Sequence, residues 1–122
     1  MKGTLLKGII LCSLAMILFA ACIVVFEYCP MNSAGRAYEQ GRYERAAGAY
    51  EFALSVRWNS GILNFNMGGA LYRKGDHEKA AGFFGKAAAS EDADLSQKAL
   101  YNLGNCRFRS AERQEDPDEA AR

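Results

Sequence analysis

The sequence predicts an all-helical protein in which an apolar N-terminal helix precedes a short array of helical hairpins. Three features indicate this fold class: a long uncharged segment, a sequence repeat of about 35 residues, and apolar residues at helical spacing inside each repeat. We therefore divide the chain into a membrane anchor or signal segment, residues 1–28, and a helical repeat domain, residues 29–122.

The uncharged segment covers residues 8–26 and follows Lys2 and Lys7. As a helix it would be about 28 Å long, which matches a hydrocarbon core of about 30 Å. The segment therefore predicts a single-pass anchor. Because no Lys or Arg follows until Arg36, we expect the N-terminus in the cytoplasm and the repeats on the far side of the cytoplasmic membrane, facing the periplasm or cell exterior.

Two other interpretations fit the same segment. Residues 19–22, Phe-Ala-Ala-Cys, resemble a bacterial lipobox, in which Cys22 would be lipidated after cleavage. The small residues there also fit an ordinary signal-peptide cleavage site. Residues 23–26 continue the apolar run where a lipoprotein usually has a polar tether, which favours the uncleaved anchor.

A repeat organises the rest of the chain. The run GRYERA at residues 41–46 returns as GDHEKA at 75–80, and NMGG at 66–69 returns as NLGN at 102–105. A period of this length is typical of stacked supersecondary units. We expect units at about residues 29–60, 61–94 and 95–122, the last of them incomplete.

Each unit has the pattern of two helices joined by a glycine turn. Small and aromatic residues recur at spacings of three and four after Ala46 and again after Ala80. Gly41 and Gly75 stand where a left-handed backbone conformation would end one helix. The expected helices are residues 33–40, 42–56, 61–74, 76–89 and 95–109, with a short one from 118.

Several residues predict where these helices begin. Pro30 is expected to break the chain's helix after the membrane or to open a new one. Asn59 or Ser60 can cap the third helix, and Asp94 with Gln97 resembles a capping box for the fifth. The single tryptophan, Trp58, is expected to cover the edge of the helix pairs.

The middle unit resembles a tetratricopeptide repeat. The resemblance is carried by Gly68, Leu71, Tyr72, Gly75, Ala80, Phe84 and Ala87, and in the first unit by Gly41, Tyr43, Ala46, Tyr50 and Ala53. Short side chains let two helices cross closely, while Tyr50 and Phe84 would fill the remaining space. The resemblance covers roughly residues 33–122 and implies a short α-solenoid.

Some positions depart from the family pattern. In the first unit, Ala34 replaces the packing glycine and Ala37 replaces a large residue. In the third unit, Arg107 stands where Leu or Tyr is usual, and residues 110–118 replace the glycine turn.

The resemblance also implies a binding surface, because the first helix of each tetratricopeptide unit lines a concave face. Transferred to this chain, that face comprises Ile62, Phe65, Asn66, Gly69, Tyr72, Arg73, Lys98, Tyr101, Asn102, Asn105, Phe108 and Arg109. Asn66 and Asn102 would pair with the backbone of a bound peptide, or alternatively satisfy neighbouring backbone groups. The bases resemble a carboxylate clamp, but Met31 stands where its first lysine would be.

Other classes of function have little support. His77 takes the place of Tyr43 in the repeat and is expected to pack or start a helix, and the acidic runs at 91–94 and 115–118 are expected to be solvated. We therefore expect no enzyme, no cofactor and no metal site. Beyond residue 26 the chain has 13 basic and 14 acidic residues, which gives no reason to expect nucleic-acid binding.

The four cysteines differ in their surroundings. Cys12 and Cys22 lie in the apolar segment and are expected to act as small hydrophobic residues, apart from the possible lipidation of Cys22. Cys29 and Cys106 lie outside the apolar segment, and a thiol redox function would have to use them, although nothing in the sequence brings them together.

The third unit stops before a second helix could form. Leu100, Leu103 and Cys106 are therefore expected to be poorly shielded, unless a longer natural chain, a partner or a second copy covers them. A charged residue such as Arg107 would suit a surface at the edge of the repeat array.

Together these features predict a membrane-anchored adaptor or scaffold that holds another envelope protein or peptide in a bacterial cell-envelope complex. An anchor followed by residues 66–75 and 101–105 resembles the tetratricopeptide members of Bat-type aerotolerance operons, which accompany von Willebrand A-domain proteins and a MoxR-type ATPase. The alternatives are an envelope lipoprotein with a structural or assembly role, and the redox protein using Cys29 and Cys106.

Overall fold

The computed structural model describes the backbone of residues 2–115 and the side chains of residues 6–25 and 32–115. This part of the chain contains five helices and no strand, which confirms the all-helical prediction. The helices are α1 (Lys2–Glu39), α2 (Tyr43–Val56), α3 (Gly61–Lys74), α4 (His77–Ala88) and α5 (Ala93–Glu115). The bounds of α2, α3 and α4 agree with the sequence-based expectation to within one residue, and the helix expected from 118 lies outside the described residues.

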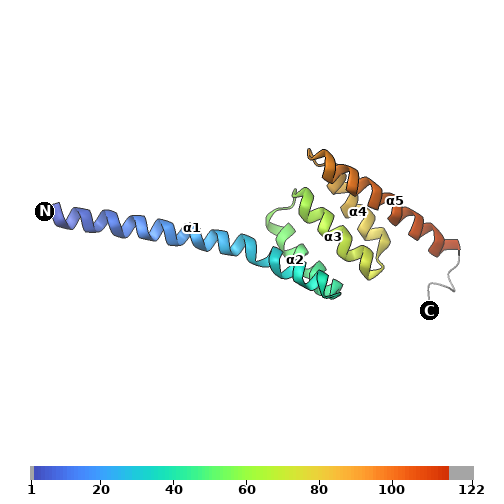
Figure 1. Cartoon of the computed structure of the whole chain (residues 1–122), viewed down its shortest axis with the longest axis horizontal. Coiled ribbons are helices and arrows are strands. Elements are labelled where there is room, and N and C mark those ends of the chain that lie inside the picture. The colour runs from blue at the N-terminus through green and yellow to red at the C-terminus, as the bar shows by residue number, and fades with distance from the viewer. Residues whose placement is uncertain (1, 116–122) are drawn as a thin grey trace.

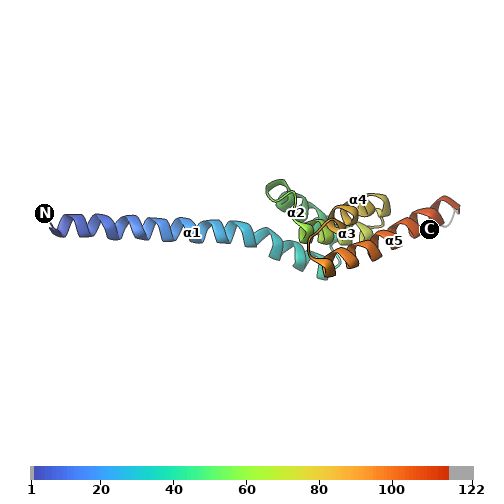
Figure 2. The same ribbon diagram turned by 90° about the horizontal axis from the view of Figure 1, so that it is seen from above.

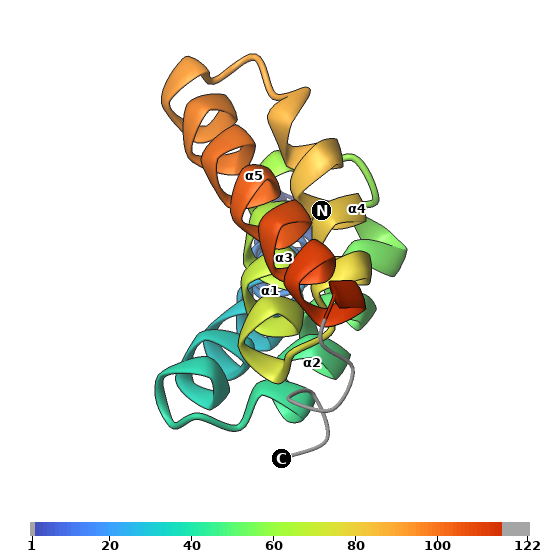
Figure 3. The ribbon, with the colours of Figure 1, turned by 90° about the vertical axis from the view of Figure 1, so that its right-hand side faces the viewer.

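The helices form a two-layered bundle, and the N-terminal part of α1 projects from it as a rod. The N-terminal part of α1 extends away from the other helices, and its C-terminal part packs against α2 (Figure 1). Seen from above and from the end, α1, α3 and α5 lie on one side while α2 and α4 lie on the other (Figures 2 and 3). Each helix packs against the next one in the chain.

The rod contains the apolar segment. Leu6–Val25 is long and apolar enough to cross a membrane, and none of it is buried inside the protein. Its side chains include Leu11, Ile17 and Phe19, each more than 60% exposed. A run of large apolar side chains with no protein contact needs an apolar environment outside the chain.

The expected break at Pro30 is wrong, because α1 continues through it to Glu39. Proline removes one backbone hydrogen bond and crowds the preceding turn, which bends a helix as often as it ends one. Ending the helix and starting a new one would leave four backbone carbonyls and four backbone N–H groups without helical hydrogen-bond partners. Residues 27–32 contain no glycine that could form a helix-ending cap. Accordingly α1 changes direction where it meets the bundle but does not stop (Figure 1).

The two glycine turns are confirmed. Gly41 and Gly75 have φ values of +72° and +91°, which only glycine adopts readily. In the first turn the N–H of Arg42 donates to the carbonyl of Ala37, and in the second the N–H of Asp76 donates to that of Leu71. The repeat in the sequence is therefore a repeat of one helix-ending hydrogen-bond pattern.

One helix cap is as expected and another is not. Ser60 caps α3, since its hydroxyl accepts a hydrogen bond from the N–H of Leu63 at 3.3 Å. At the start of α5 the cap is Asp92, whose carboxylate accepts from the N–H groups of Asp94 and Leu95 at 3.0 and 3.2 Å. Asp94 is not the cap; it forms an ion pair with Lys98 at 2.6 Å.

Helix α5 is longer than expected. It continues to Glu115, whereas the sequence pattern suggested a loop from residue 110. Residues 110–115 contain neither glycine nor proline, and most of them are good helix formers, so no residue in this stretch ends the helix. The ion pair between Arg109 and Glu112, at 3.1 Å and three residues apart, supports the same turn.

The core is built on one close helix crossing. The ring of Phe84, 2% exposed, lies directly against Gly68, where an added Cβ would come within 2.9 Å of it. Around this contact the helices meet through small residues and a few large ones. The buried apolar residues are Ala34, Ala37, Ala46, Ala47, Tyr50, Ala53, Leu63, Met67, Ala70, Leu71, Ala80, Phe84, Ala87, Ala99 and Cys106.

This crossing gives a paired test of stability. Gly68→Ala should place a methyl group against the fixed ring of Phe84, while Gly104→Ala on α5 has nothing within 4 Å of the new methyl. Both changes gain the same helix propensity, so Gly68→Ala should be the less stable variant by about 1–3 kcal/mol. Urea unfolding in detergent, followed by circular dichroism, measures the difference. Equal stability of the two variants would contradict the close crossing.

Candidate functional site

A small cavity opens between the first two hairpins. It has a volume of about 170 Å³ and is lined by Tyr38 of α1, Tyr50 of α2, and Phe65, Asn66 and Gly69 of α3. Gly69 leaves room for Tyr38, whose hydroxyl would lie 3.7 Å from a Cβ at that position. The cavity therefore exists because a glycine faces an aromatic residue across the α1–α3 seam.

The lining of this cavity is aromatic and uncharged. Burial raises the pKa of Tyr50, and the neighbouring Tyr38 and Glu39 raise it further, so its hydroxyl stays protonated. The amide of Asn66 supplies both a donor and an acceptor. Aromatic walls with a few uncharged polar groups suit an apolar side chain whose neighbouring backbone pairs with the Asn66 amide.

The structure brings only three residues of the predicted concave face, Phe65, Asn66 and Gly69, into this cavity. Phe65 also packs edge-to-face against Phe84, with ring centroids 5.5 Å apart. Farther along α3, Tyr72 lies against the ring of His77 at 4.9 Å, and Ile62 is exposed at the opposite end of the helix.

The basic residues expected on the concave face already have partners. Arg73 donates to the hydroxyl of Tyr43 at 3.0 and 2.9 Å and lies over its ring. Lys98 pairs with Asp94, and Arg109 pairs with Glu112. These contacts are exposed and weak, but they occupy the groups that a carboxylate clamp would use.

The remaining predicted residues lie on α5, away from the cavity. Tyr101 and Phe108 are 72% and 63% exposed, and Asn102 and Asn105 are half-buried. They belong to the same layer as Asn66, but none of them lines the cavity with it.

Tyr38 is the lining residue that the sequence interpretation missed. It stands 34 residues before Tyr72, which is the same offset that relates Gly41 to Gly75. The repeat alignment therefore contains the signal. Ala34 and Ala37, which depart from the family pattern, are both buried, and they allow α2 to approach α1 closely.

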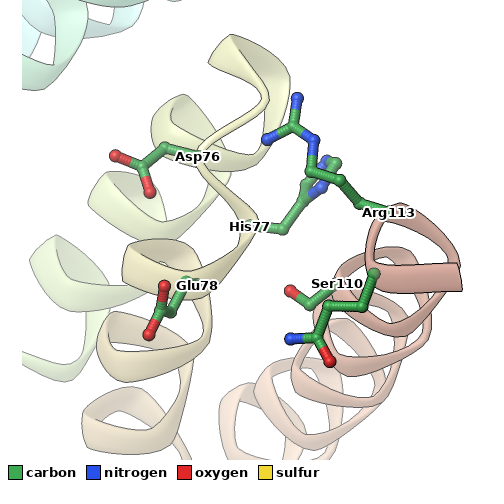
Figure 4. Close-up of a pocket in the computed structure, with 6 residues that line it drawn as sticks. Asp76, His77, Glu78, Ser110 and Arg113 are labelled. Carbon is green, nitrogen blue, oxygen red and sulfur yellow. The ribbon is translucent and has the colours of Figure 1, made fainter. Parts of the chain in front are cut away.

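A second cavity, of about 300 Å³, lies where the α3–α4 turn meets the last turns of α5. It is lined by Asp76, His77, Glu78, Ser110, Arg113 and Gln114 (Figure 4). Arg113 crosses the junction and donates to the carbonyl of Gly75 at 3.4 Å. The extra length of α5 therefore forms this site, because Ser110 and Arg113 both lie in the unexpected turns.

The second cavity holds Asp, His and Ser side chains without joining them. Asp76 caps α4 through the N–H of Lys79 and pairs with the Lys79 ammonium group at 3.1 Å, and it points away from His77 (Figure 4). The Nδ1 atom of His77 is buried and has no hydrogen-bond partner. Because a nucleophile, a base and an orienting acid must be hydrogen-bonded in sequence, this arrangement is no catalytic triad.

Burial lowers the pKa of His77, and the charges of Arg113 and Arg109 lower it further, while Asp76 partly opposes them. As expected, His77 packs at the start of a helix, the first residue of α4. Among the described residues, no group of three or more His, Cys, Asp or Glu side chains could hold a metal ion.

The open side of α5 is shielded unevenly. Leu100 is 55% exposed, as expected, and Leu103 is half-buried. Cys106 is fully buried in the core, so the expectation that it would be poorly shielded is wrong. It faces the bundle, and burial raises the pKa of its thiol.

Comparison with protein-family models gave no match, and comparison with curated proteins also gave none.

The second cavity generates a pH prediction. His77 is the only histidine, and its folded-state pKa lies below the usual value of 6.5. The unfolded chain therefore binds the extra proton first, and stability should fall as the pH drops from about 7 to about 5. His77→Tyr, which restores the residue of the first repeat, should flatten this dependence. Urea unfolding midpoints at both pH values, measured for the two chains, give this pH dependence. If His77→Tyr shows the same loss of stability between about pH 7 and about pH 5, His77 is not its cause.

Proposed function

We propose that the chain is a membrane-anchored adaptor whose tetratricopeptide-like repeats hold another polypeptide beside the bilayer. The observation that carries the proposal is the aromatic cavity around Asn66, which lies between the first helices of two neighbouring hairpins. Three of its lining residues, Phe65, Asn66 and Gly69, belong to α3, the first helix of the second hairpin, and tetratricopeptide units use their first helices to bind peptides.

Three features support a tetratricopeptide-like solenoid. The glycine turns at Gly41 and Gly75 have the same conformation, Phe84 packs closely against Gly68 within one hairpin, and Tyr50, 34 residues before Phe84, is also buried. Such stacking leaves one layer of first helices exposed as a continuous wall.

The favoured ligand is a peptide segment with an apolar side chain. No charged group lines the cavity, and the bases expected on the concave face, Arg73, Lys98 and Arg109, are engaged by Tyr43, Asp94 and Glu112. A terminal carboxylate would have to displace these partners, whereas a neutral backbone can pair with the Asn66 amide directly. An envelope partner, including one of the Bat type, is compatible with this chemistry.

The exposed span supports attachment through α1. Lys2, which precedes the span Leu6–Val25, and Lys7, which lies at its start, favour a cytoplasmic N-terminus, with the repeats facing the periplasm or cell exterior. Lipidation of Cys22 remains the alternative. The redox alternative gains no support from Cys106, because a buried thiol with a raised pKa forms little of the reactive thiolate.

Site-specific photo-crosslinking tests the adaptor proposal. A benzophenone amino acid at Tyr101, on the α5 wall, should give a discrete crosslinked partner in native membranes. The same probe at Glu51, exposed on α2, should give none. Adding Asn66→Ala should reduce the Tyr101 crosslink about fivefold, because one hydrogen bond contributes about 1 kcal/mol. Equal crosslinks from both probes would contradict recognition by this layer.

The anchor can be tested separately. Cys22→Ser should remain in the membrane pellet after alkaline extraction, with Met1 present in its intact mass. Leu14→Arg combined with Leu18→Arg should release the chain, since each charge costs about 2.5–3.5 kcal/mol in the bilayer centre. A diacylglyceryl group on Cys22 of the unaltered chain would instead establish the lipoprotein alternative.

A further inference from the structure

An apolar patch surrounds the α2–α3 turn. We call it the turn patch; its members are Phe52, Val56, Trp58 and Ile62, which are between 51% and 76% exposed. Phe52 and Val56 are one helical turn apart on α2, and Ile62 is the second residue of α3. Trp58 is the most exposed of the four, so the expectation that it covers the edge of the helix pairs is wrong.

The turn patch lies at the end of the bundle from which the apolar span extends. From Glu39 back to Val25, α1 covers about 21 Å along its axis, and α2 runs back for about 20 Å from Tyr43 to Val56. The end of α2 therefore returns toward the apolar run. Figure 1 shows the α2–α3 turn on the side of the bundle from which the rod of α1 extends.

The composition of this turn suits a lipid headgroup region. Tryptophan concentrates at membrane interfaces because its ring is apolar and its N–H is polar, and the exposed Arg57 beside it can reach lipid phosphates. The next turn at the same end, between α4 and α5, carries Ser90, Glu91 and Asp92 instead. Only the turn that lies beside α1 is apolar.

We propose that the α2–α3 turn inserts into the interfacial region of the same bilayer that α1 spans, with Trp58 as the inserted side chain. This inference rests on the proposed membrane anchor. The occupant of the turn patch is lipid, because a continuous helix holds the patch at the membrane surface. The repeat domain would then be attached at two points, which fixes its rotation about α1.

The single tryptophan makes the test direct. The full chain is reconstituted into phosphatidylcholine vesicles with a minority of phosphatidylglycerol, and flotation establishes that it is inserted. Trp58 emission should shift to shorter wavelength, and nitroxide groups placed near the lipid headgroups should quench most of it. Aqueous acrylamide should quench it weakly.

A matched reporter places tryptophan elsewhere. In Trp58→Phe combined with Tyr101→Trp, the reporter lies on α5 at a position that is 72% exposed. Its quenching by headgroup nitroxides should be several-fold weaker than that of Trp58, and its quenching by acrylamide several-fold stronger.

The outcomes separate this inference from the proposed anchor. A chain that floats but shows water-like Trp58 emission overturns the interfacial turn and leaves the anchor intact. If Trp58 emission shifts to shorter wavelength but headgroup nitroxides do not quench it, protein and not lipid covers Trp58. That result also overturns the interfacial turn. A chain that does not float overturns both proposals.

Discussion

One uninterrupted helix connects the apolar span to the repeat domain, and the rest of the arrangement depends on it. The same α1 is fully exposed over Leu6–Val25 and buries Ala34 and Ala37 against α2. A flexible linker would leave the domain free to rotate and to move away from the bilayer. A helical connection transmits orientation instead, so in the proposed membrane-anchored arrangement the packing of the first hairpin decides which turn faces the lipid.

Small residues determine how tightly the hairpins follow that first helix. Ala34 and Gly68 occupy equivalent places in the repeat, and each lets the second helix of its hairpin approach closely. On α5, Gly104 meets nothing, since no second helix covers it in the described residues. One position of the sequence repeat therefore has three different environments within the described residues.

The sequence allowed the helices and their turns to be predicted because their causes are local. A glycine at positive φ and a serine cap act within four residues, and Gly41, Gly75 and Ser60 were all identified. The errors have causes that local patterns do not contain. Helix α1 continues through Pro30 because nothing nearby caps an end there, and Asp92 and Asp94 are chemically identical candidates for one cap. The cavity depends on Tyr38 meeting Gly69 across two helices, and no local pattern reveals that distance.

Charge explains why the candidate surface favours neutral ligands. Most basic groups near the first-helix layer have nearby partners: Arg73 holds Tyr43, Lys74 pairs with Glu44 at 2.5 Å, and Lys98 pairs with Asp94. Exposed pairs contribute little to stability, but they cancel the field that would attract an anionic peptide from a distance. Recognition at the Asn66 cavity must then depend on shape and short-range contact. Short-range recognition is slow for a freely diffusing protein, and the proposed anchor would compensate for the missing steering by concentrating the protein and a partner in the same membrane.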